Sequence, residues 1–354
     1  MFNIFNIFKK TNESLTADII KENDKILGML YEGIVGDYLG VPFEFTKRNE
    51  VDFTGPIEFG THNQPLGTWS DDTSLSLCLI DNIIECWKPS FYTDIVQYNN
   101  NVFVDNNIVL CDLMQRFLNC KRNGSYTPAG RLFDCGTTIN QSLVRFEMNR
   151  DLSSCGGRDS DTCGNGTIMR IAPLISLQKV RSLTDSKLYD LSYAYTHITH
   201  NTEVTVLGSF IYLKILIELY KYPEDAISSI LNKIDSSVQK LIEIGKVSPN
   251  AYTHYRKLLS TSFVDLPYES IKSSGYVVDT LESAVWLLNR FSSYKESMRS
   301  VMELGMDTDT LGQVLGSMIG IRYGYSAVPL EWINYIQNKI FVDEKIIKLI
   351  NFKI

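Results

Sequence analysis

Apolar residues recur at every third or fourth position along most of this chain, which is the spacing that lines one face of an α-helix. Residues 40–68 are instead rich in turn-forming residues, and at most short strands fit there. We therefore expect an all-α fold. The pattern predicts helices over residues 16–36, 73–87, 107–121, 136–149, 166–178, 187–196, 202–220, 224–244, 250–260, 278–291, 294–304, 309–323 and 330–338.

The chain shows no internal boundary in its sequence pattern. There is no internal repeat, and no Pro- or Ser-rich linker or block of charge divides it. We expect one compact multi-helix domain over residues 23–354, preceded by an N-terminal extension over residues 1–22. The segment 221–275 is the most polar stretch, and we expect it at the periphery of the domain.

Two of the predicted helices carry regularly spaced glycines. Glycine costs a helix about 1 kcal/mol per residue relative to alanine, so a stripe of glycines indicates helices that approach closely in a crowded core. Spaced glycines are also typical of helix pairs in membranes, but Gln313 and Arg322 interrupt this apolar run. The glycines are Gly312, Gly316, Gly320 and Gly324 in one segment, and Gly28, Gly33, Gly36 and Gly40 in the other.

The composition narrows the class of protein. The 354 residues suffice for a sizeable core, and 44% hydrophobic with 21% charged residues is an ordinary globular balance. A net charge of -7 disfavours non-specific binding to nucleic acid or anionic membranes. The seven cysteines are odd in number and none are paired as C-x-x-C, so neither a disulfide framework nor a zinc knuckle is indicated. A reducing compartment is expected.

The N-terminal stretch "MFNIFNIFKK" does not have the pattern of a signal peptide. It lacks a basic first region, asparagines break its apolar run, and no small-residue cleavage site follows. No run of about 18 apolar residues occurs either, so no membrane span is expected and a cytoplasmic location is the prediction. We expect residues 1–15 to form a partner-binding arm. Folding back onto the domain and lying on a membrane surface are the alternatives.

Two aspartate pairs stand at predicted helix starts, in "GTWSDDTSLSL" and "LGMDTDTLG". Helix capping explains either pair alone, because carboxylates favour the positive end of a helix. Four carboxylates at the ends of central helices would repel one another without a positive charge between them, and Glu44 follows another helix end. Oxygen ligands with hydroxyls between them suit Mg²⁺, Mn²⁺ or Ca²⁺ rather than zinc, and such a set can bridge two ions.

Three further stretches carry polar groups suited to a ligand, each with an ordinary structural explanation. The Gly-rich "GGRDSDTCGNGTIMRIAPL" leads into a predicted helix and could hold phosphate through backbone N–H groups, or be a plain loop. His200 in "THITHNTEV" precedes a helix start and is either a ligand contact or a structural histidine. Asp134 in "RLFDCGTTINQSL" is either a functional carboxylate or a helix cap.

In this order, the motifs resemble those of the ADP-ribosylglycohydrolase family, which includes the dinitrogenase reductase-activating glycohydrolases. The matching stretches are "GIVGDYLGVPFE", "GTWSDDTSLSL", "FDCGTTINQSL", "GNGTIMRIAPL", "THITH" and "LGMDTDTLGQVLGSMIGIRYGYSAVPLEW", between residues 28 and 332. The resemblance implies an all-α fold around a binuclear Mg²⁺ or Mn²⁺ centre. It also implies hydrolysis of the N- or O-glycosidic bond between ADP-ribose and a protein side chain or small acceptor.

The resemblance also implies roles for single residues. The implied metal ligands are Ser70, Asp71, Asp72, Asp307, Asp309 and Thr310. The implied catalytic residues are Glu44, Asp134, Asp72 and Asp309, with Glu44 or Asp134 handling the proton. The implied substrate contacts are Gly164, Asn165, Gly166, His200 and Thr137.

Three positions depart from the family pattern. Ser70 stands where threonine is usual, and its hydroxyl should serve equally well as a metal ligand. Met306 replaces the second glycine of Gly-Gly-Asp, which puts the local backbone shape in doubt. Thr137 stands where arginine-type members often carry asparagine, so contacts with the acceptor could differ.

The expected function is removal of ADP-ribose from modified protein side chains, most of all from ADP-ribosyl-arginine. Because bacterial members of the family can accompany ADP-ribosylating toxins as immunity proteins, the alternative is neutralisation of an ADP-ribosyltransferase by direct binding through the N-terminal arm. The intact set of ligand residues favours catalysis over pure binding and over a structural relative without activity. The expected partners are therefore an ADP-ribosylated protein and, in the alternative, an ADP-ribosyltransferase toxin.

Overall fold

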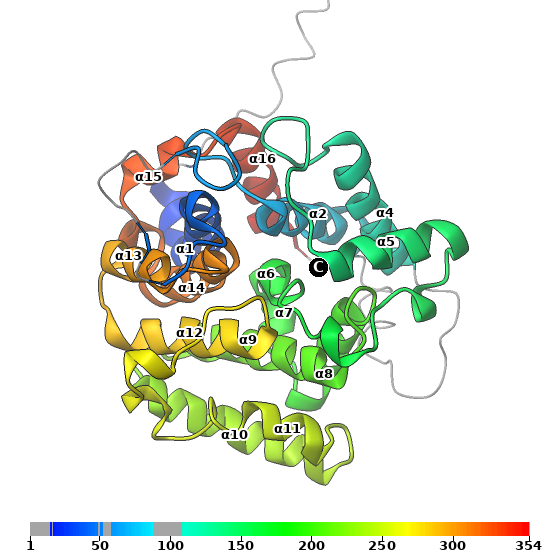
Figure 1. Ribbon diagram of the computed structural model, residues 1–354, viewed down its shortest axis with the longest axis vertical. Coiled ribbons are helices and arrows are strands. Elements are labelled where there is room, and N and C mark those ends of the chain that lie inside the picture. The colour runs from blue at the N-terminus through cyan, green and yellow to red at the C-terminus, as the bar shows by residue number, and fades with distance from the viewer. Residues whose placement is uncertain (1–14, 16, 49, 52–57, 88–107, 354) are drawn as a thin grey trace, which may run out of the picture.

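The computed structural model describes the chain except residues 1–14, 16, 49, 52–57, 88–107 and 354. Helices make up its regular structure, with three isolated β-bridges and no sheet among the described residues (Figure 1). The all-α prediction is confirmed. The α-helices are α1 (Ala17–Gly40), α2 (Asp71–Cys86), α4 (Ile108–Asn123), α5 (Thr137–Asn149), α6 (Ile168–Ile171), α7 (Gln178–Arg181), α8 (Asp185–Thr196), α9 (Glu203–Lys221), α10 (Ile227–Glu243), α11 (Pro249–Tyr255), α12 (Val277–Arg290), α13 (Tyr294–Leu304), α14 (Thr308–Tyr323), α15 (Leu330–Tyr335) and α16 (Lys339–Ile350).

Two predicted helices need correction, and one further helix was not predicted. The helix predicted over 166–178 is wrong beyond its first turn, because α6 stops at Ile171 and a 3-10 helix, Ala172–Ser176, follows. Pro173 explains the break, since proline has no N–H to continue the helical ladder. The helix predicted over 250–260 already ends at Tyr255. Helix α16, which lies beyond the last predicted helix, was missed.

Helices α1 and α14 form the centre of the fold and pack along their glycines. A Cβ atom placed on Gly312 would lie 2.3 Å from the Gly36 carbonyl oxygen, and one on Gly316 would lie 2.1 Å from that of Glu32. A Cβ on Gly28 would lie 2.4 Å from the Gly320 carbonyl oxygen. Real side chains never approach so closely, so glycine is required for this separation. The predicted close helix–helix approach is confirmed, and Figure 1 shows the two helices side by side.

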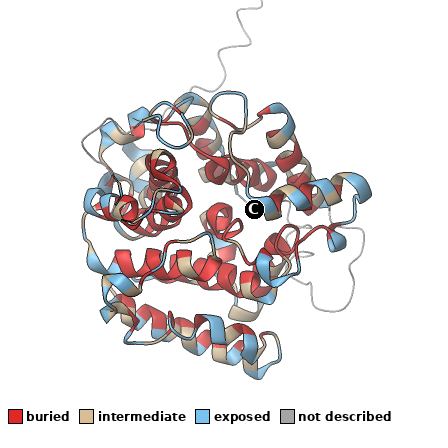
Figure 2. Cartoon of the chain, in the orientation of Figure 1, coloured by how far each residue is buried: buried red, intermediate tan, exposed pale blue. Residues whose placement is uncertain are grey.

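The other helices surround this pair. Helix α9 is buried over nearly all its length, and α12 packs against both α9 and α14 (Figure 2). Helices α10 and α11 lie at one end of the molecule (Figure 1), with α10 burying only one face against α9. The polar segment 221–275 is therefore peripheral, as expected.

The structure tests only part of the predictions about the N-terminal segment. The first 14 residues, which make up almost all of the predicted arm, lie outside the described residues, so the arm stays a prediction. The proposed boundary between residues 22 and 23 falls inside α1, where Asn23 leaves helical geometry with φ −119° and ψ 16°. None of the described helices combines the length and hydropathy needed to cross a membrane.

Glu32 is a carboxylic acid enclosed in the α1–α14 core. The residue has no exposed surface, and neither carboxylate oxygen has a hydrogen-bond partner of ordinary geometry. Its backbone carbonyl accepts a 2.5 Å hydrogen bond from the Tyr294 hydroxyl. Burial, and secondarily the charge of Asp24, raise the pKa of Glu32 well above its ordinary value, while the Val328 backbone lowers it slightly. Ionisation of Glu32 therefore opposes folding.

We expect Glu32→Gln to flatten the pH dependence of stability. A folded-state pKa above the unfolded value gives stability that is complete below the ordinary pKa and is lost as the pH rises toward the folded pKa. Relative to wild type, the variant should gain about 1.4 kcal/mol per pH unit across that window. Urea unfolding from pH 5 to pH 8 measures the difference. Glu331→Gln, at an exposed position, is the matched control, and equal pH slopes for Glu32→Gln and wild type would refute the assignment.

Candidate active site

Three segments far apart in the sequence bring their carboxylates together at the ends of α1, α2 and α14. One carboxylate oxygen from each of Asp37, Asp72 and Asp309 lies within 4.8 Å of the other two. Glu44, Asp307 and Asp309 form a second group within the same limit, and Asp309 belongs to both groups. Two adjacent sets of oxygens that share one member are the arrangement expected of a site for two cations.

Helix capping explains only part of this arrangement. Ser70 is the N-cap of α2, and its hydroxyl oxygen accepts a 3.2 Å hydrogen bond from the Asp72 N–H. The Ser70 hydroxyl also donates to the Asp72 carboxylate at 3.0 Å, and the Thr310 hydroxyl donates to the same carboxylate at 3.2 Å. Asp307 occupies the N-cap position of α14 but caps no helical N–H with its side chain. The Asp309 carboxylate accepts the Thr310 N–H at 2.8 Å, so a bond to the helical backbone accounts for at most one of the two aspartates of the second motif.

The carboxylates are buried without an ion pair to lysine or arginine among the described residues. Asp71, Asp72 and Asp309 are at most 4% exposed. Burial, followed by repulsion from neighbouring carboxylates, raises the pKa of each of these three groups well above its ordinary value. No lysine or arginine among the described residues forms an ion pair with any carboxylate of the two groups. This negative cluster requires a cation or protons.

The donor set fits divalent metal ions. One carboxylate oxygen of Asp71, Oδ2, is buried with no hydrogen-bond partner, so it has an unused lone pair inside the site. Hydroxyl and carboxylate oxygens are the ligands of hard cations such as Mg²⁺, Mn²⁺ and Ca²⁺. The residues that could hold such ions are Asp37, Glu44, Ser70, Asp71, Asp72, Asp307, Asp309 and Thr310.

Divalent ions are therefore expected to raise the melting temperature. An ion that binds only the native state stabilises it by about 2.7 kcal/mol at 100 times its dissociation constant. The shift should be several degrees between excess chelator and millimolar Mg²⁺ or Mn²⁺, at matched ionic strength. Asp71→Asn should show a smaller shift, because it loses one ligand charge. A wild-type melting curve that chelator and metal leave unchanged would count against the cation site.

Asp37 is a member of the cluster that the sequence analysis did not select. It lies near the end of α1, and its carboxylate accepts hydrogen bonds from the Ser70 N–H at 3.0 Å and from the Thr73 hydroxyl at 2.5 Å. Burial raises its pKa to about 6, although these hydrogen bonds lower it. A charged residue inside a buried, glycine-rich helix is the signal that could have identified it, since such a charge needs a partner.

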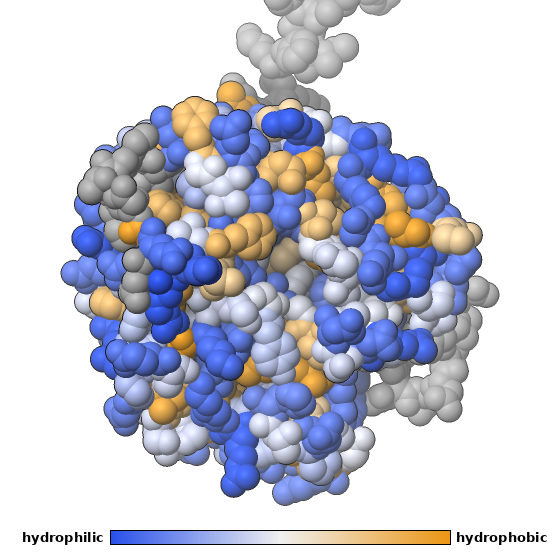
Figure 3. Space-filling model, in the orientation of Figure 1, coloured by the Kyte–Doolittle hydropathy of each residue, from blue (hydrophilic) through white to orange (hydrophobic). Residues whose placement is uncertain are grey.

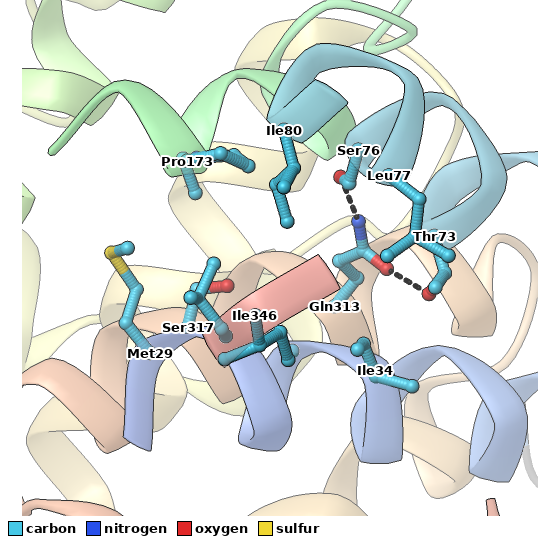
Figure 4. Close-up of a pocket in the computed structure, with 13 residues that line it drawn as sticks. Met29, Ile34, Thr73, Ser76, Leu77, Ile80, Pro173, Gln313, Ser317 and Ile346 are labelled. Carbon is cyan, nitrogen blue, oxygen red and sulfur yellow. Dashed lines mark hydrogen bonds between the residues drawn. The ribbon is translucent and has the colours of Figure 1, made fainter. Parts of the chain in front are cut away.

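The buried Gln313 amide contacts Thr73, which is a hydrogen-bond partner of Asp37. The Gln313 side-chain oxygen lies 2.9 Å from the Thr73 hydroxyl (Figure 4). The same hydroxyl is 2.5 Å from the Asp37 carboxylate. The Gln313 amide nitrogen donates to the Ser76 hydroxyl at 3.1 Å and also to the Met169 carbonyl. Pro173 leaves that carbonyl without its usual helical donor. Gln313 of α14 thus supplies the hydrogen-bond donor that the Met169 carbonyl lacks where helix α6 is broken.

His62 is a second residue that the sequence analysis missed. Its Nε2 atom is paired with the Glu44 carboxylate, and Asp134 lies within 4.8 Å of both groups. Burial raises the pKa of Glu44 to about 7, while the hydrogen bond with His62 lowers it. That hydrogen bond raises the pKa of His62. His62 lies in a turn-rich segment, and no periodicity or motif marked it.

The predicted substrate loop touches the carboxylate cluster directly. The Asn165 side chain donates hydrogen bonds to Asp307 at 2.8 Å and to Thr280 at 2.9 Å. A Cβ on Gly166 would lie 2.9 Å from the His200 ring, so the loop passes closely over that histidine. His200 is buried, and its Nδ1 atom is 2.9 Å from the Thr199 hydroxyl. Burial and the nearby Arg170 charge lower the pKa of His200 to about 3, so the ring is neutral.

The remaining predicted residues lie around this loop and the start of α5. A Cβ on Gly164 would lie 3.5 Å from His200 Nε2. Asp134 does not cap α5, which has no side-chain cap; within the described part of the chain its carboxylate accepts the Cys135 N–H, at 2.8 Å. Thr137 is exposed as the first residue of α5, and the preceding Gly136 backbone lowers the pKa of Asp71. The start of α5 therefore borders the cluster. The roles of these residues stay predictions.

The fold and the site together define an all-helical protein with a buried carboxylate centre suited to divalent cations. The family model for ADP-ribosylglycohydrolase matches residues 18–351, and the chain belongs to this family. The predicted family, and with it the predicted class of enzyme, a glycohydrolase acting on ADP-ribosyl bonds, is confirmed.

Relatives from several organisms match most of the chain. It is 25% identical over 315 residues to "ADP-ribosylarginine hydrolase Tri1" of Pseudomonas putida (strain GB-1), covering 88% of this chain and 73% of the relative. It is 23% identical over 329 residues to "ADP-ribosyl-[dinitrogen reductase] glycohydrolase" of Rhodospirillum rubrum, covering 90% and 92%. A solved "ADP-ribosylglycohydrolase-related protein complex" superposes with a TM-score of 0.68 at 24% identity, covering 93% and 98%, and supports the fold.

Proposed function

We propose that this chain hydrolyses the N-glycosidic bond of ADP-ribosyl-arginine in modified proteins. The observation that carries the proposal is the pair of carboxylate groups that share Asp309 and reach the substrate loop through Asn165. Two relatives, from Pseudomonas putida and Serratia proteamaculans, are named ADP-ribosylarginine hydrolases, and the second is 26% identical over 315 residues. Those names support arginine as the acceptor here.

The proposed cofactors are two Mg²⁺ or Mn²⁺ ions. Ser70, Asp71, Asp72, Asp307, Asp309 and Thr310 would hold them, with Asp37 and Glu44 beside them. Bound there, such ions supply an electrophilic anchor for the ribose hydroxyls and a source of activated water. The unpaired Asp71 oxygen, and the lack of a lysine or arginine ion pair to the clustered carboxylates among the described residues, support this assignment.

The chain's own residues orient the substrate. The loop from Gly164 to Gly166 and the neutral His200 would bind ADP-ribose, and Asn165 fixes this loop against Asp307. Holding the ribose in one orientation converts the attack of water into a step within a single complex, which is a large part of the rate gain available to an enzyme.

Glu44 and Asp134 are proposed to manage the proton. The two carboxylates converge on His62, and Glu44 also lies in the group that contains Asp307, the partner of Asn165. A departing guanidine needs a proton, and positive charge develops on the sugar ring, so carboxylates at the scissile bond serve both needs. The guanidinium product is itself a cation, and these carboxylates favour its binding.

A panel of acceptors tests the proposal. Purified protein with Mg²⁺ is incubated with peptides that carry ADP-ribose on arginine, on serine or on a carboxylate, and released ADP-ribose is measured. We expect release from the arginine peptide at a rate at least about tenfold above the others. With a serine or carboxylate acceptor, the carboxylates that would pair with the guanidinium have no cationic partner. Preferred release from serine, or none from arginine, would overturn the assignment of the acceptor.

A further inference from the structure

Two bulky apolar residues project from the backbone immediately beside the carboxylate cluster. Phe45 follows Glu44 and is 61% exposed, and Met306 precedes Asp307 and is 41% exposed. The Phe45 N–H donates to the Met306 carbonyl at 2.6 Å, and the Met306 N–H donates to the Thr46 carbonyl at 2.7 Å. These two bonds tie the loops together. We name Phe45 and Met306 the apolar rim.

Both rim residues have an unfavourable backbone conformation. Phe45 has φ +63° and Met306 has φ +65°, in the left-handed region that glycine adopts freely and bulky side chains rarely enter. Met306 occupies the position where the family pattern has glycine, and its backbone keeps a conformation suited to glycine. Stability alone therefore favours glycine at both positions. Strained residues of this kind concentrate where side chains have a function.

Aromatic rings continue from the rim along the proposed proton-handling groups. The Phe45 ring centroid is 5.9 Å from that of His62, and the Phe133 ring is 5.2 Å from His62. His62 pairs with Glu44, and Phe133 immediately precedes Asp134. Figure 3 shows apolar side chains gathered around a hollow near the middle of the displayed face. The groups around His62 combine carboxylates with apolar and aromatic side chains.

The chemistry of this surface matches the side chain of arginine. A guanidinium ion is attracted by carboxylates and by the faces of aromatic rings, and its methylene stem packs on apolar groups. The leaving group must lie beside the residue that protonates it, which places it next to Glu44 and Asp134. The predicted ADP-ribose loop meets the cluster at Asp307, through the Asn165 side chain.

We propose that Phe45 and Met306 bind the modified arginine side chain of the substrate protein and so determine the preference for this acceptor. The inference rests on the proposed function, because it takes ADP-ribosyl-arginine as the substrate. It assigns to the rim a contact with the departing part of the substrate only. Binding of the ADP-ribose part should be independent of both residues.

The test uses Phe45→Gly and Met306→Gly in the full chain. Glycine suits both backbone conformations, so neither variant should melt below wild type. We expect KM for an ADP-ribosyl-arginine peptide to rise about five- to tenfold, a range typical of losing a cation–π or apolar contact. We expect kcat within about twofold and unchanged inhibition by free ADP-ribose. Met306→Gln, which keeps the length but not the apolar character, should also raise KM.

Asn338→Gly is the matched control, because Asn338 also has a positive φ, of 45°, and is exposed at the start of α16. It should leave KM unchanged. Wild-type KM in both glycine variants, or an equal rise in the inhibition constant of ADP-ribose, would overturn the rim's role. Failure of wild-type protein to cleave the arginine peptide would instead overturn the proposed function, and the assignment of the rim to arginine with it.

Discussion

Asp309→Asn is expected to lower the rate of ADP-ribose release by at least about 100-fold while the helical fold is retained. Asp309 contributes an oxygen to both carboxylate groups, so its replacement weakens both halves of the proposed cation site at once. Asparagine keeps the shape of the side chain and removes the charge. Steady-state rates at limiting Mg²⁺, with circular dichroism as a check of the fold, measure the effect, and Asp71→Ala should behave similarly.

The same variant should be more stable than wild type when metal is removed. Burial raises the pKa of Asp309 well above its ordinary value, so ionising this group opposes folding until a cation binds. Asp161→Asn, an exposed change in the neighbouring loop, is the control for both readouts. Near-wild-type turnover of Asp309→Asn in limiting Mg²⁺ would show that the assignment of two cations to this cluster is wrong.

Gly316→Leu is expected to cause the largest loss of stability of any change considered, although residue 316 contacts no candidate ligand. Even a Cβ at this position would lie 2.1 Å from the Glu32 carbonyl oxygen, within the α1–α14 contact. Overpacking of a core typically costs about 1–3 kcal/mol, and a backbone obstruction exceeds that range because it cannot move aside as a side chain can. Urea unfolding, or the yield of folded protein, measures the loss.

Val144→Leu, on an exposed position of α5, is the control for adding bulk to a helix and should change stability by less than about 0.5 kcal/mol. Gly316→Ala should be intermediate between wild type and leucine, because it adds only the obstructing Cβ. An unfolding curve of Gly316→Leu that coincides with wild type would mean that α1 and α14 do not approach as closely as described.

Periodicity and glycine spacing were sufficient to predict most of the architecture. Helical repeats of apolar residues are local, so a single sequence shows them. The glycine stripes predicted close helix–helix approach, and the structure shows that the two striped helices, α1 and α14, contact each other. Pro173 was the signal for the broken helix at 166–178, and its effect was underestimated. Helix α16 was missed although its sequence, "KIFVDEKIIKLI", alternates apolar and charged residues at helical spacing.

The site residues that could be predicted from the sequence are the carboxylates beside predicted helix starts. Both aspartate motifs were identified because paired carboxylates followed by threonine are unusual enough to need an explanation. Asp37 and His62 were not, because their roles depend on long-range contacts: Asp37 faces Ser70 and Thr73, and His62 reaches Glu44 across a turn. The structure also shows the backbone conformation of Met306, which the sequence left in doubt.

The central claim is that divalent cations at the carboxylate cluster are required to release ADP-ribose from arginine. The most direct measurement is the rate of ADP-ribose release from an ADP-ribosyl-arginine protein by wild-type enzyme in chelator, and again after Mg²⁺ or Mn²⁺ is restored. We predict that release stops in chelator and returns in full with either ion. Release at the same rate in chelator as in metal would contradict the account.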